Sequence, residues 1–194
     1  MLNFFKRPVI YTDRIRLRLP ERGDFTSWSK LRADSEDFLR PWEPSWTPYH
    51  LSRGAFFSRV YWAHKSHRKG TAMPLLLIRK DDDAILGGIT LDNIRRGPAQ
   101  SGSLGYWIGK RFARNGYMKE AVPALVHHAF TILDLSRIEA ACLPDNVASR
   151  GLLEKTGFKY EGVAQCYLEI EGRWSHHVLY ANLRPDRRGL AVKG

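Results

Sequence analysis

The sequence predicts an α+β domain in which helices cover both faces of a mixed, mostly antiparallel β-sheet. Two observations support this fold class. Strand-like and helical patterns follow one another as strand, helices, three antiparallel strands, helix, strand, helix and two strands. In addition, 43% of the 194 residues are hydrophobic, which is typical of a globular chain with a sizeable core. We therefore expect one domain spanning residues 1–194, with a frayed polar tail at 185–194.

The first half of the chain is expected to supply four strands and two helices. Apolar residues alternate with arginines over residues 14–19, which predicts a half-buried strand. Asp24 is a candidate cap for the helix that follows it, and residues 51–68 have the pattern of a second helix. Three prolines within residues 38–48 exclude a regular helix and predict a tryptophan-rich loop. Further strands are expected at residues 74–79, 84–94 and 104–108, with a turn at 80–83.

A long amphipathic helix is expected at residues 117–133. Pro123 lies inside it, removes one backbone hydrogen bond and is expected to bend the helix. The face predicted to be buried consists of apolar residues with helical spacing, namely Met118, Ala121, Val122, Leu125, Ala129 and Ile132.

The remaining pattern predicts a strand, a short helix and a closing hairpin. The strand covers residues 137–143, and either Asp145 or Asn146 caps the short helix after it. Glycine at position 157 is expected to end that helix. The last two strands, with a Glu-Gly turn between them, are expected at residues 167–170 and 177–183.

Composition limits the partners and the compartment. A formal charge of +11 favours polyanions such as a nucleotide-like cofactor, RNA or a ribosomal surface, although a basic surface that serves only solubility fits equally well. No apolar run approaches the roughly 18 residues of a membrane span, and the N-terminus lacks the apolar core of a signal peptide. Cys142 and Cys166 do not make a disulfide framework, so we expect buried free thiols in a cytoplasmic protein.

The segment from Arg111 to Gly116 is the first candidate binding site. It follows a predicted strand and opens the helix at 117–133, so free backbone amides and the helix dipole there favour an anion. Gly116 allows close approach of the backbone, and Arg111 and Arg114 add positive charge. A pyrophosphate fits such a site, whereas the motifs of ATP and dinucleotide binding are absent from the sequence.

The combination of motifs resembles the GNAT superfamily of acetyl-CoA-dependent N-acetyltransferases, and within it the RimJ/RimL type. The resemblance runs from residues 12–18 to residues 177–183, and it implies a GNAT-like sheet. The pyrophosphate signature of the family is Arg/Gln-x-x-Gly-x-Gly/Ala, and in this chain Arg114 replaces its first glycine. We expect the site to be kept, because arginine costs little there if its φ is negative. The second signature is matched by Asn146, Ser149, Glu154, Lys155, Gly157 and Phe158.

The resemblance also implies which residues bind acetyl-CoA. Main-chain groups of the strand at 104–108 would pair with the pantetheine amides like an added strand. Asn146 and Ser149 would contact the pantetheine, with helix capping as their alternative role. The full set of expected cofactor-binding residues is Tyr106, Trp107, Ile108, Arg111, Arg114, Asn115, Gly116, Tyr117, Met118, Asn146, Ser149 and Lys155.

Acetyl transfer needs a neutral amine, a polarised thioester carbonyl and a stabilised thiolate. A backbone N–H near Trp107 or Ile108 is expected to polarise the carbonyl. Many GNAT enzymes use a tyrosine as the acid just before Glu-Lys, but this chain has Leu153 there, so Ser149 becomes the candidate donor. Glu139 and Asp92 are the candidate bases, with an ion pair and turn capping as their respective alternatives.

The function expected from the resemblance is transfer of an acetyl group from acetyl-CoA to the N-terminal α-amine of a ribosomal protein, with alanine as the acceptor residue. An α-amine has a pKa near 8, so it needs only a modest base. Two alternatives remain, a small-molecule amine held by Trp42, Trp46 and Trp62, or a CoA- or ribosome-binding module without catalysis. The sequence leaves open whether the protein is a monomer or a homodimer, and no metal site is expected.

Overall fold

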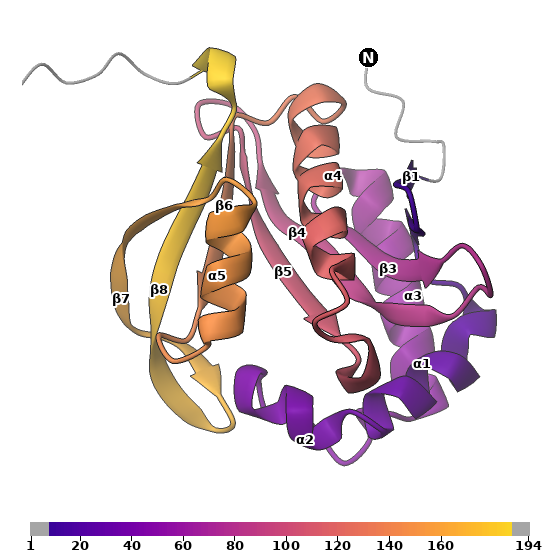
Figure 1. The fold of residues 1–194 in the computed structure, drawn as a ribbon. Coiled ribbons are helices and arrows are strands. Elements are labelled where there is room, and N and C mark those ends of the chain that lie inside the picture. Colours follow the sequence, from indigo (N-terminus) through magenta and orange to yellow (C-terminus); the bar gives the residue numbers. More distant parts are fainter. Residues whose placement is uncertain (1–7, 188–194) are drawn as a thin grey trace, which may run out of the picture.

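The computed structural model describes residues 8–187, and within this range the chain forms one eight-stranded sheet in the order β1-β2-β3-β4-β5-β6-β8-β7 (Figure 1). Only β5 and β6 are parallel, and every other neighbouring pair is antiparallel. This confirms the predicted mixed, mostly antiparallel sheet. The strands are β1 (Val9–Tyr11), β2 (Ile15–Arg18), β3 (Met73–Arg79), β4 (Ile85–Arg95), β5 (Ser101–Ile108), β6 (Arg137–Cys142), β7 (Lys159–Ile170) and β8 (Arg173–Leu183).

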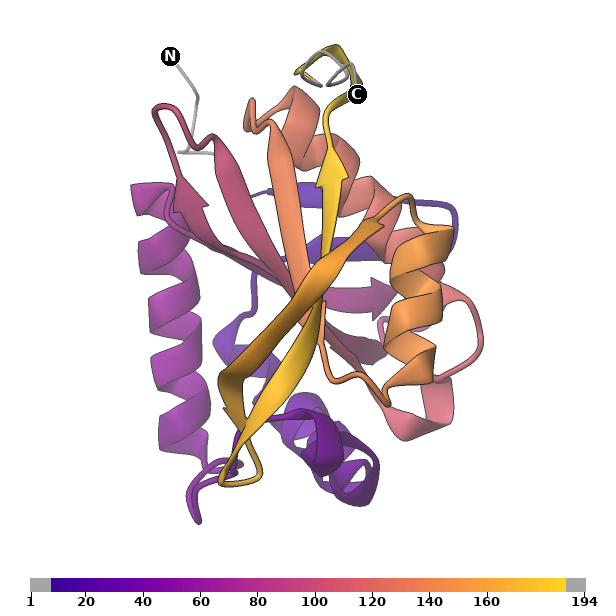
Figure 2. The same cartoon turned by 90° about the vertical axis from the view of Figure 1, so that its left-hand side faces the viewer.

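Helices cover both faces of the sheet, as predicted. In Figure 2, α3 lies against one face, and α4 and α5 lie against the other. The described helices are α1 (Phe25–Ala33), α2 (Glu36–Leu39), α3 (Arg53–Lys69), α4 (Tyr117–Thr131) and α5 (Val147–Lys155). None of them is both long and apolar enough to cross a membrane.

The central strands are buried because both of their faces are covered. β3 reads as a continuous apolar run, and six of its seven residues are buried. β2 alternates instead, with Ile15 and Leu17 fully buried and arginines between them, as its sequence pattern predicted. The core therefore lies on both sides of the sheet, which fixes the position of β4 and β5 between the helical layers.

The apolar face of α4 is buried as predicted, with one exception. Ile132 is 54% exposed, because the helix ends at Thr131 and the chain turns away there. Leu133 and Leu135 fill the core in its place. Pro123 is accommodated inside the helix.

Two N-terminal predictions need correction. Asp24 does not cap α1, because its carboxylate pairs with Arg18 at 2.6 and 2.7 Å and accepts the backbone N–H of Glu21. The predicted loop at 38–48 begins as helix, since α2 runs to Leu39 and a 3-10 turn covers Arg40–Trp42. Proline in the first turn of a helix costs no hydrogen bond, which explains why Pro41 is tolerated there.

The closing hairpin is longer than predicted, since β7 begins at Lys159 and β8 at Arg173. Its turn is correctly placed: Glu171 and Gly172 both have positive φ, of 47° and 78°, as the tight turns of hairpins require. Most of β7 is exposed, so its sequence lacks the apolar signal that marks a buried strand. Cys166 lies on this strand and is exposed, whereas Cys142 is buried as expected.

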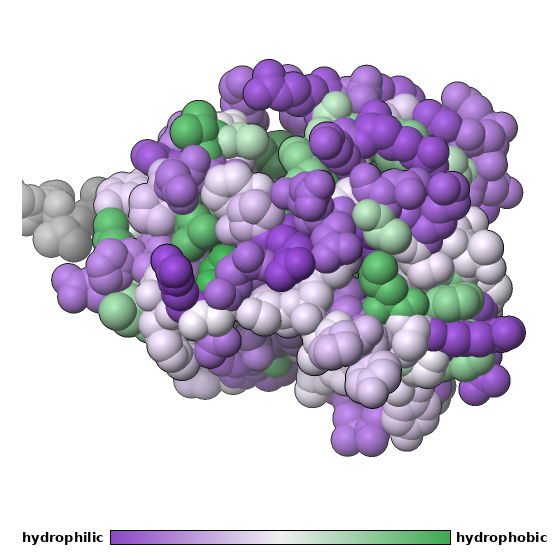
Figure 3. Space-filling model, turned by 90° about the horizontal axis from the view of Figure 1, so that it is seen from below, coloured by the Kyte–Doolittle hydropathy of each residue, from purple (hydrophilic) through white to green (hydrophobic). Residues whose placement is uncertain are grey.

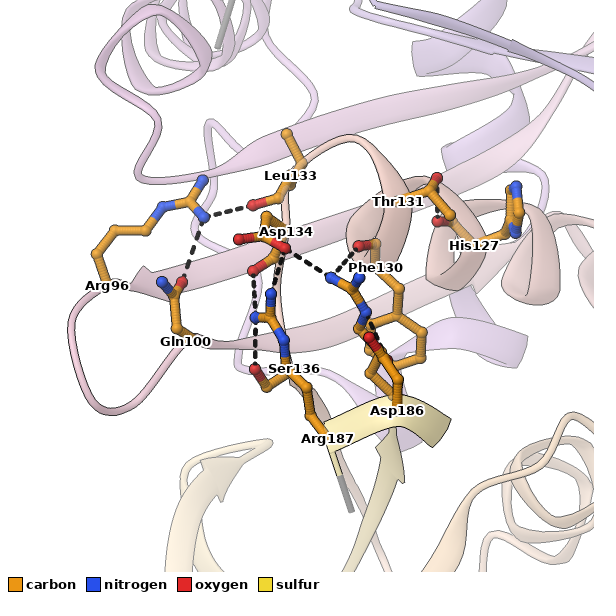
Figure 4. Close-up of polar contacts among 11 residues, drawn as sticks. Arg96, Gln100, His127, Phe130, Thr131, Leu133, Asp134, Ser136, Asp186 and Arg187 are labelled. Atoms are coloured by element: carbon orange, nitrogen blue, oxygen red, sulfur yellow. Dashed lines mark hydrogen bonds and ion pairs between the residues drawn. The ribbon is translucent and has the colours of Figure 1, made fainter. Parts of the chain in front are cut away.

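The chain after β8 is held at its start. Arg184 pairs with Asp134 at 2.6 Å and with Asp186 at 2.8 Å, and Arg187 pairs with Asp134 at 2.5 Å (Figure 4). Pro185–Arg187 thus forms a 3-10 turn where a frayed tail was expected. The rest of that predicted tail, residues 188–194, lies outside the described part of the chain.

The packing of β4 against β5 depends on glycine. A Cβ atom on Gly87 would lie 2.3 Å from the carbonyl oxygen of Trp107, and one on Gly88 would lie 2.5 Å from the indole nitrogen of the same residue. Position 87 faces main chain, which cannot swing aside as a side chain can. The end of β5 therefore keeps its place only while residue 87 has no side chain.

We expect Gly87→Ala to lower the free energy of unfolding by about 3 kcal/mol, the upper end of the usual cost of overpacking. Urea denaturation followed by circular dichroism measures this. The control is Gly105→Ala, because a Cβ atom at Gly105 meets nothing within 4 Å. Equal stability of the two variants would contradict the close approach.

Candidate functional site

The parallel strands β5 and β6 separate before they end. They pair from Ser101 opposite Arg137 to Leu104 opposite Ala140, and the pairing stops there. β5 continues to Ile108 while still paired with β4 on its other side. Main-chain groups of β5 that face β6 are thus left for another partner, such as an extended ligand with amide groups.

Neighbouring residues of this free end point to opposite faces of the sheet. The Tyr106 hydroxyl lies 2.7 Å from the Ser149 hydroxyl of α5. The Trp107 indole lies on the other face, over Gly88 and 4.7 Å from the guanidinium of Arg32. The end of β5 therefore forms a wall that separates two compartments, the α5 compartment on one face of the sheet and the α1 compartment on the other.

The α5 compartment contains a chain of polar groups. Asn146 caps α5, since its side-chain oxygen accepts the backbone N–H of Ser149 at 3.0 Å, and this leaves the Ser149 hydroxyl for Tyr106. Burial raises the pKa of the Tyr106 phenol far above its ordinary value, although the hydrogen bond with Ser149 opposes this. Burial also raises the pKa of the Cys142 thiol, which Ser149 contacts as well.

The loop between β5 and α4 has the geometry of an anion site. Gly116, with φ of +82°, precedes the first turn of α4, whose N–H groups have no partner within the helix. Arg114 has φ of +62°, so the condition under which arginine would cost little at this position is not met. The loop keeps the left-handed conformation that suits the family's glycine, and arginine adopts it at a cost of roughly 1–2 kcal/mol.

Arg14, which the sequence analysis did not single out, holds this loop in place. Its guanidinium donates to the main-chain oxygen of Asn115 at 3.1 Å, pairs with Glu120 at 2.8 Å and lies 4.5 Å from the ring centre of Tyr117. Burial opposes ionisation of Glu120, but hydrogen bonds from Thr12 and Arg14 lower its pKa. The connection between β1 and β2, far away in sequence, thus fixes the start of α4.

The predicted cofactor residues fall into two groups around the free end of β5. Residues 106–118 follow the strand and its loop, and Asn146 and Ser149 face them from the start of α5. Met118 is buried, so only its main chain can serve a ligand. Lys155 lies six residues beyond Ser149 on α5, about 9 Å at 1.5 Å per residue.

The two candidate bases lie at the other end of β5. Asp92 and Glu139 flank Ser103 from either side, four residues and about 13 Å before Trp107. Glu139 pairs with Arg95 at 3.0 Å and with Arg137 at 2.9 Å, and Asp92 accepts the N–H of the next residue. Both carboxylates thus lie away from the free end of β5 and already have partners, which does not suit a catalytic base.

A cavity of about 550 Å³ occupies the α1 side of the wall. Seen from below, this end of the molecule is mostly polar with small separate apolar patches (Figure 3). Trp62 lines the cavity and Trp46 stacks on a lining histidine, whereas Trp42 is not part of its lining. Its lining includes Trp28, Arg32, Glu43, His50, Arg59 and Trp107.

Four charged or titratable side chains meet in this cavity. Arg32, whose side chain is only 5% exposed, pairs with both oxygens of Glu43 at 2.8 and 2.5 Å. His50 lies between Arg32 and Arg59, with its ring nitrogens 3.0 and 3.1 Å from their guanidinium groups. Burial and these two cations lower the pKa of His50 to about 4, so its ring is neutral at pH 7.

Sequence reasoning missed this second group of residues. They come from α1, from the loop before α3 and from α3, and no spacing within the sequence connects them. Their only sequence signal was the tryptophan-rich segment at 38–48, which supplies Glu43 and Trp46.

The comparisons with known proteins agree with this geometry. Residues 14–159 match the family model described as an acetyltransferase (GNAT) domain. The chain is 34% identical over 175 residues to the [ribosomal protein uS5]-alanine N-acetyltransferase of Escherichia coli, and the match covers 90% of each chain.

Solved structures are similar as well. RimJ of Mycobacterium smegmatis, in complex with CoA-disulfide, matches with a TM-score of 0.87 and 28% identity, over 94% of this chain and 90% of that one. The ribosomal-protein-S5-alanine acetyltransferase of Vibrio fischeri matches with a TM-score of 0.86 and 26% identity, over 94% and 100%. The chain therefore belongs to the GNAT family of N-acetyltransferases, is of the RimJ/RimL type and uses acetyl-CoA as its co-substrate.

Proposed function

We propose that this enzyme acetylates the N-terminal α-amine of a protein, with an alanine of a ribosomal protein as the acceptor and with action close to the ribosome. The observation that carries the proposal is the 34% identity, over 90% of both chains, to an enzyme named for alanine acetylation of ribosomal protein uS5. The charge of +11 favours an RNA-rich setting, although it does not select the acceptor.

The two compartments suggest where each substrate lies. Acetyl-CoA would place its pyrophosphate on the loop from Arg111 to Gly116 and its pantetheine along the free edge of β5. The acceptor amine would enter from the cavity beside Trp107. Because an α-amine has a pKa near 8, about a tenth of it is neutral at pH 7, and positioning supplies much of the remaining rate.

The Ser149 hydroxyl would stabilise the departing sulfur. The amine nitrogen attacks the thioester carbon, the C–S bond breaks, and the proton released by nitrogen reaches sulfur or solvent. Tyr106 holds its proton through this step, because burial keeps its pKa well above that of a thiol. It therefore donates a hydrogen bond to Ser149, and Ser149 donates to the sulfur. In this way Ser149 would take the role of the tyrosine acid of many GNAT enzymes, whose position is occupied by Leu153 in this chain.

We expect Ser149→Ala to lower kcat by tenfold to a hundredfold, roughly the worth of a hydrogen bond to a charged group. Tyr106→Phe should lower kcat by about tenfold, and in both variants kcat should fall more than the affinity for acetyl-CoA. The cap of α5 survives in Ser149→Ala, because Asn146 binds the main-chain N–H. Tyr160→Phe, an exposed tyrosine on β7, is the control. Unchanged turnover in both site variants would show that the hydrogen bonds from Tyr106 to Ser149 and from Ser149 to the sulfur have no part in the mechanism.

The strained residue of the loop gives a second prediction. Arg114→Gly should raise the free energy of unfolding by up to about 1 kcal/mol, because glycine adopts a positive φ without a clash. The same change should weaken acetyl-CoA binding, most strongly at low salt, because a charge facing the pyrophosphate is lost. Arg114→Lys keeps the charge and the strain, so it should behave like the native protein. Equal affinity of all three at low salt would place the guanidinium away from the cofactor.

The acceptor is tested by intact-mass spectrometry of ribosomal proteins that lack N-terminal acetylation. Incubation with the enzyme and acetyl-CoA should add one acetyl group to one protein, at an N-terminal alanine. A small-molecule amine is the second candidate, because Trp28, Trp62 and Trp107 line the cavity. No acetylated protein, together with tight acetyl-CoA binding, would favour that candidate.

A further inference from the structure

The lining of the cavity on the α1 side includes two arginines but a single carboxylate. Arg32 is neutralised by Glu43, which accepts from both of its terminal nitrogens. Arg59 lines the same cavity and lies 5.7 Å from the ring centre of Trp28, but within residues 8–187 it makes no ion pair. Because arginine stays protonated in proteins, the cavity has an excess positive charge beside its acceptor wall.

The hydrogen bonds around His50 are also incomplete. Its two ring nitrogens lie 3.0 Å from Arg32 and 3.1 Å from Arg59, and both arginines can only donate. A neutral imidazole offers one acceptor nitrogen, so one of the two contacts opposes two donors. The His50 ring stacks on the Trp46 ring, with 4.4 Å between the ring centres, and this contact holds the imidazole in place. In the same cluster, Nε of Arg32 is buried and has no acceptor within the described residues.

We propose that Arg59 and His50 form a carboxylate-binding subsite, and that the acceptor of this enzyme carries an acidic group close to its reacting amine. A carboxylate oxygen would accept from Arg59, pair with its charge and relieve the opposed donors at His50. The subsite shares its cavity with Trp107 and Gly88, at the end of β5 where the acetyl group is proposed to lie. This inference rests on the proposed function and narrows its substrate class.

Two sources could supply that carboxylate. One is the side chain of an aspartate or glutamate near the N-terminus of a protein acceptor. The other is the α-carboxylate of a small amino acid. A volume of about 550 Å³ accommodates either, so the experiment must distinguish them.

The test uses two matched pairs of acceptors. The first pair consists of two peptides with N-terminal alanine, one with glutamate and the other with glutamine at each of positions 2 to 4. The second pair consists of alanine and alaninamide. For the native enzyme we expect kcat/KM to be at least tenfold higher for the carboxylate member of one pair. Arg59→Met should abolish that preference. Arg53→Met, which removes an arginine on the same helix that stacks on Phe25 and Phe57, should keep it.

A native enzyme that treats both members of each pair alike would overturn the subsite, as would an Arg59→Met variant that keeps the preference. If the enzyme prefers alanine over alaninamide and does not acetylate the peptides, the proposal of a protein acceptor is wrong. The proposed carboxylate subsite would still be supported by that result. If no amine is acetylated, calorimetry with N-acetylglutamate decides: equal binding, or no binding, by the native protein and Arg59→Met would overturn the proposal.

Discussion

The loss of pairing between β5 and β6 after Leu104 and Ala140 organises the whole site. Because these strands are parallel, the segments that follow them leave from the same edge of the sheet, and α4 and α5 both begin there. The free N–H groups of one helix start and the capped start of the other therefore flank one opening. The unpaired end of β5 divides that opening into the α5 compartment, where we propose that acetyl-CoA binds, and the α1 compartment, where we propose that the acceptor binds.

Local patterns predicted the elements that form the α5 compartment. The fold class, the loop before α4 and the cap at Asn146 depend on periodicity, on glycine and on short-range hydrogen bonds, all of which are legible in a single sequence. The positive φ at Arg114 could not be predicted in this way. The loop has the conformation that suits the family's glycine, and arginine adopts that conformation at this position. Arg14 was missed for another reason, since it acts on the loop through tertiary contact alone.

The α1 compartment could not be predicted because long-range packing creates it. Arg32 lies between the rings of Trp46 and Trp107, at 4.5 and 4.7 Å, and holds Glu43. The turn of the β7–β8 hairpin reaches the same segment, where the N–H of Glu171 donates to the main-chain oxygen of Glu43 at 3.2 Å. A buried ion pair adds little net stability, since desolvation offsets its attraction. Its contribution here is to fix the position of the cavity wall.

The alternation of Tyr106 and Trp107 has a consequence for how this family of sites can vary. An insertion or deletion of one residue near the end of β5 would exchange the faces on which these two side chains lie. The indole would then face Ser149 and the phenol would face Arg32. Changes of length in this strand are therefore tolerable only in steps of two residues. The loop before α3 lines the same cavity and is not bound by this alternation, so its length can change without exchanging Tyr106 and Trp107.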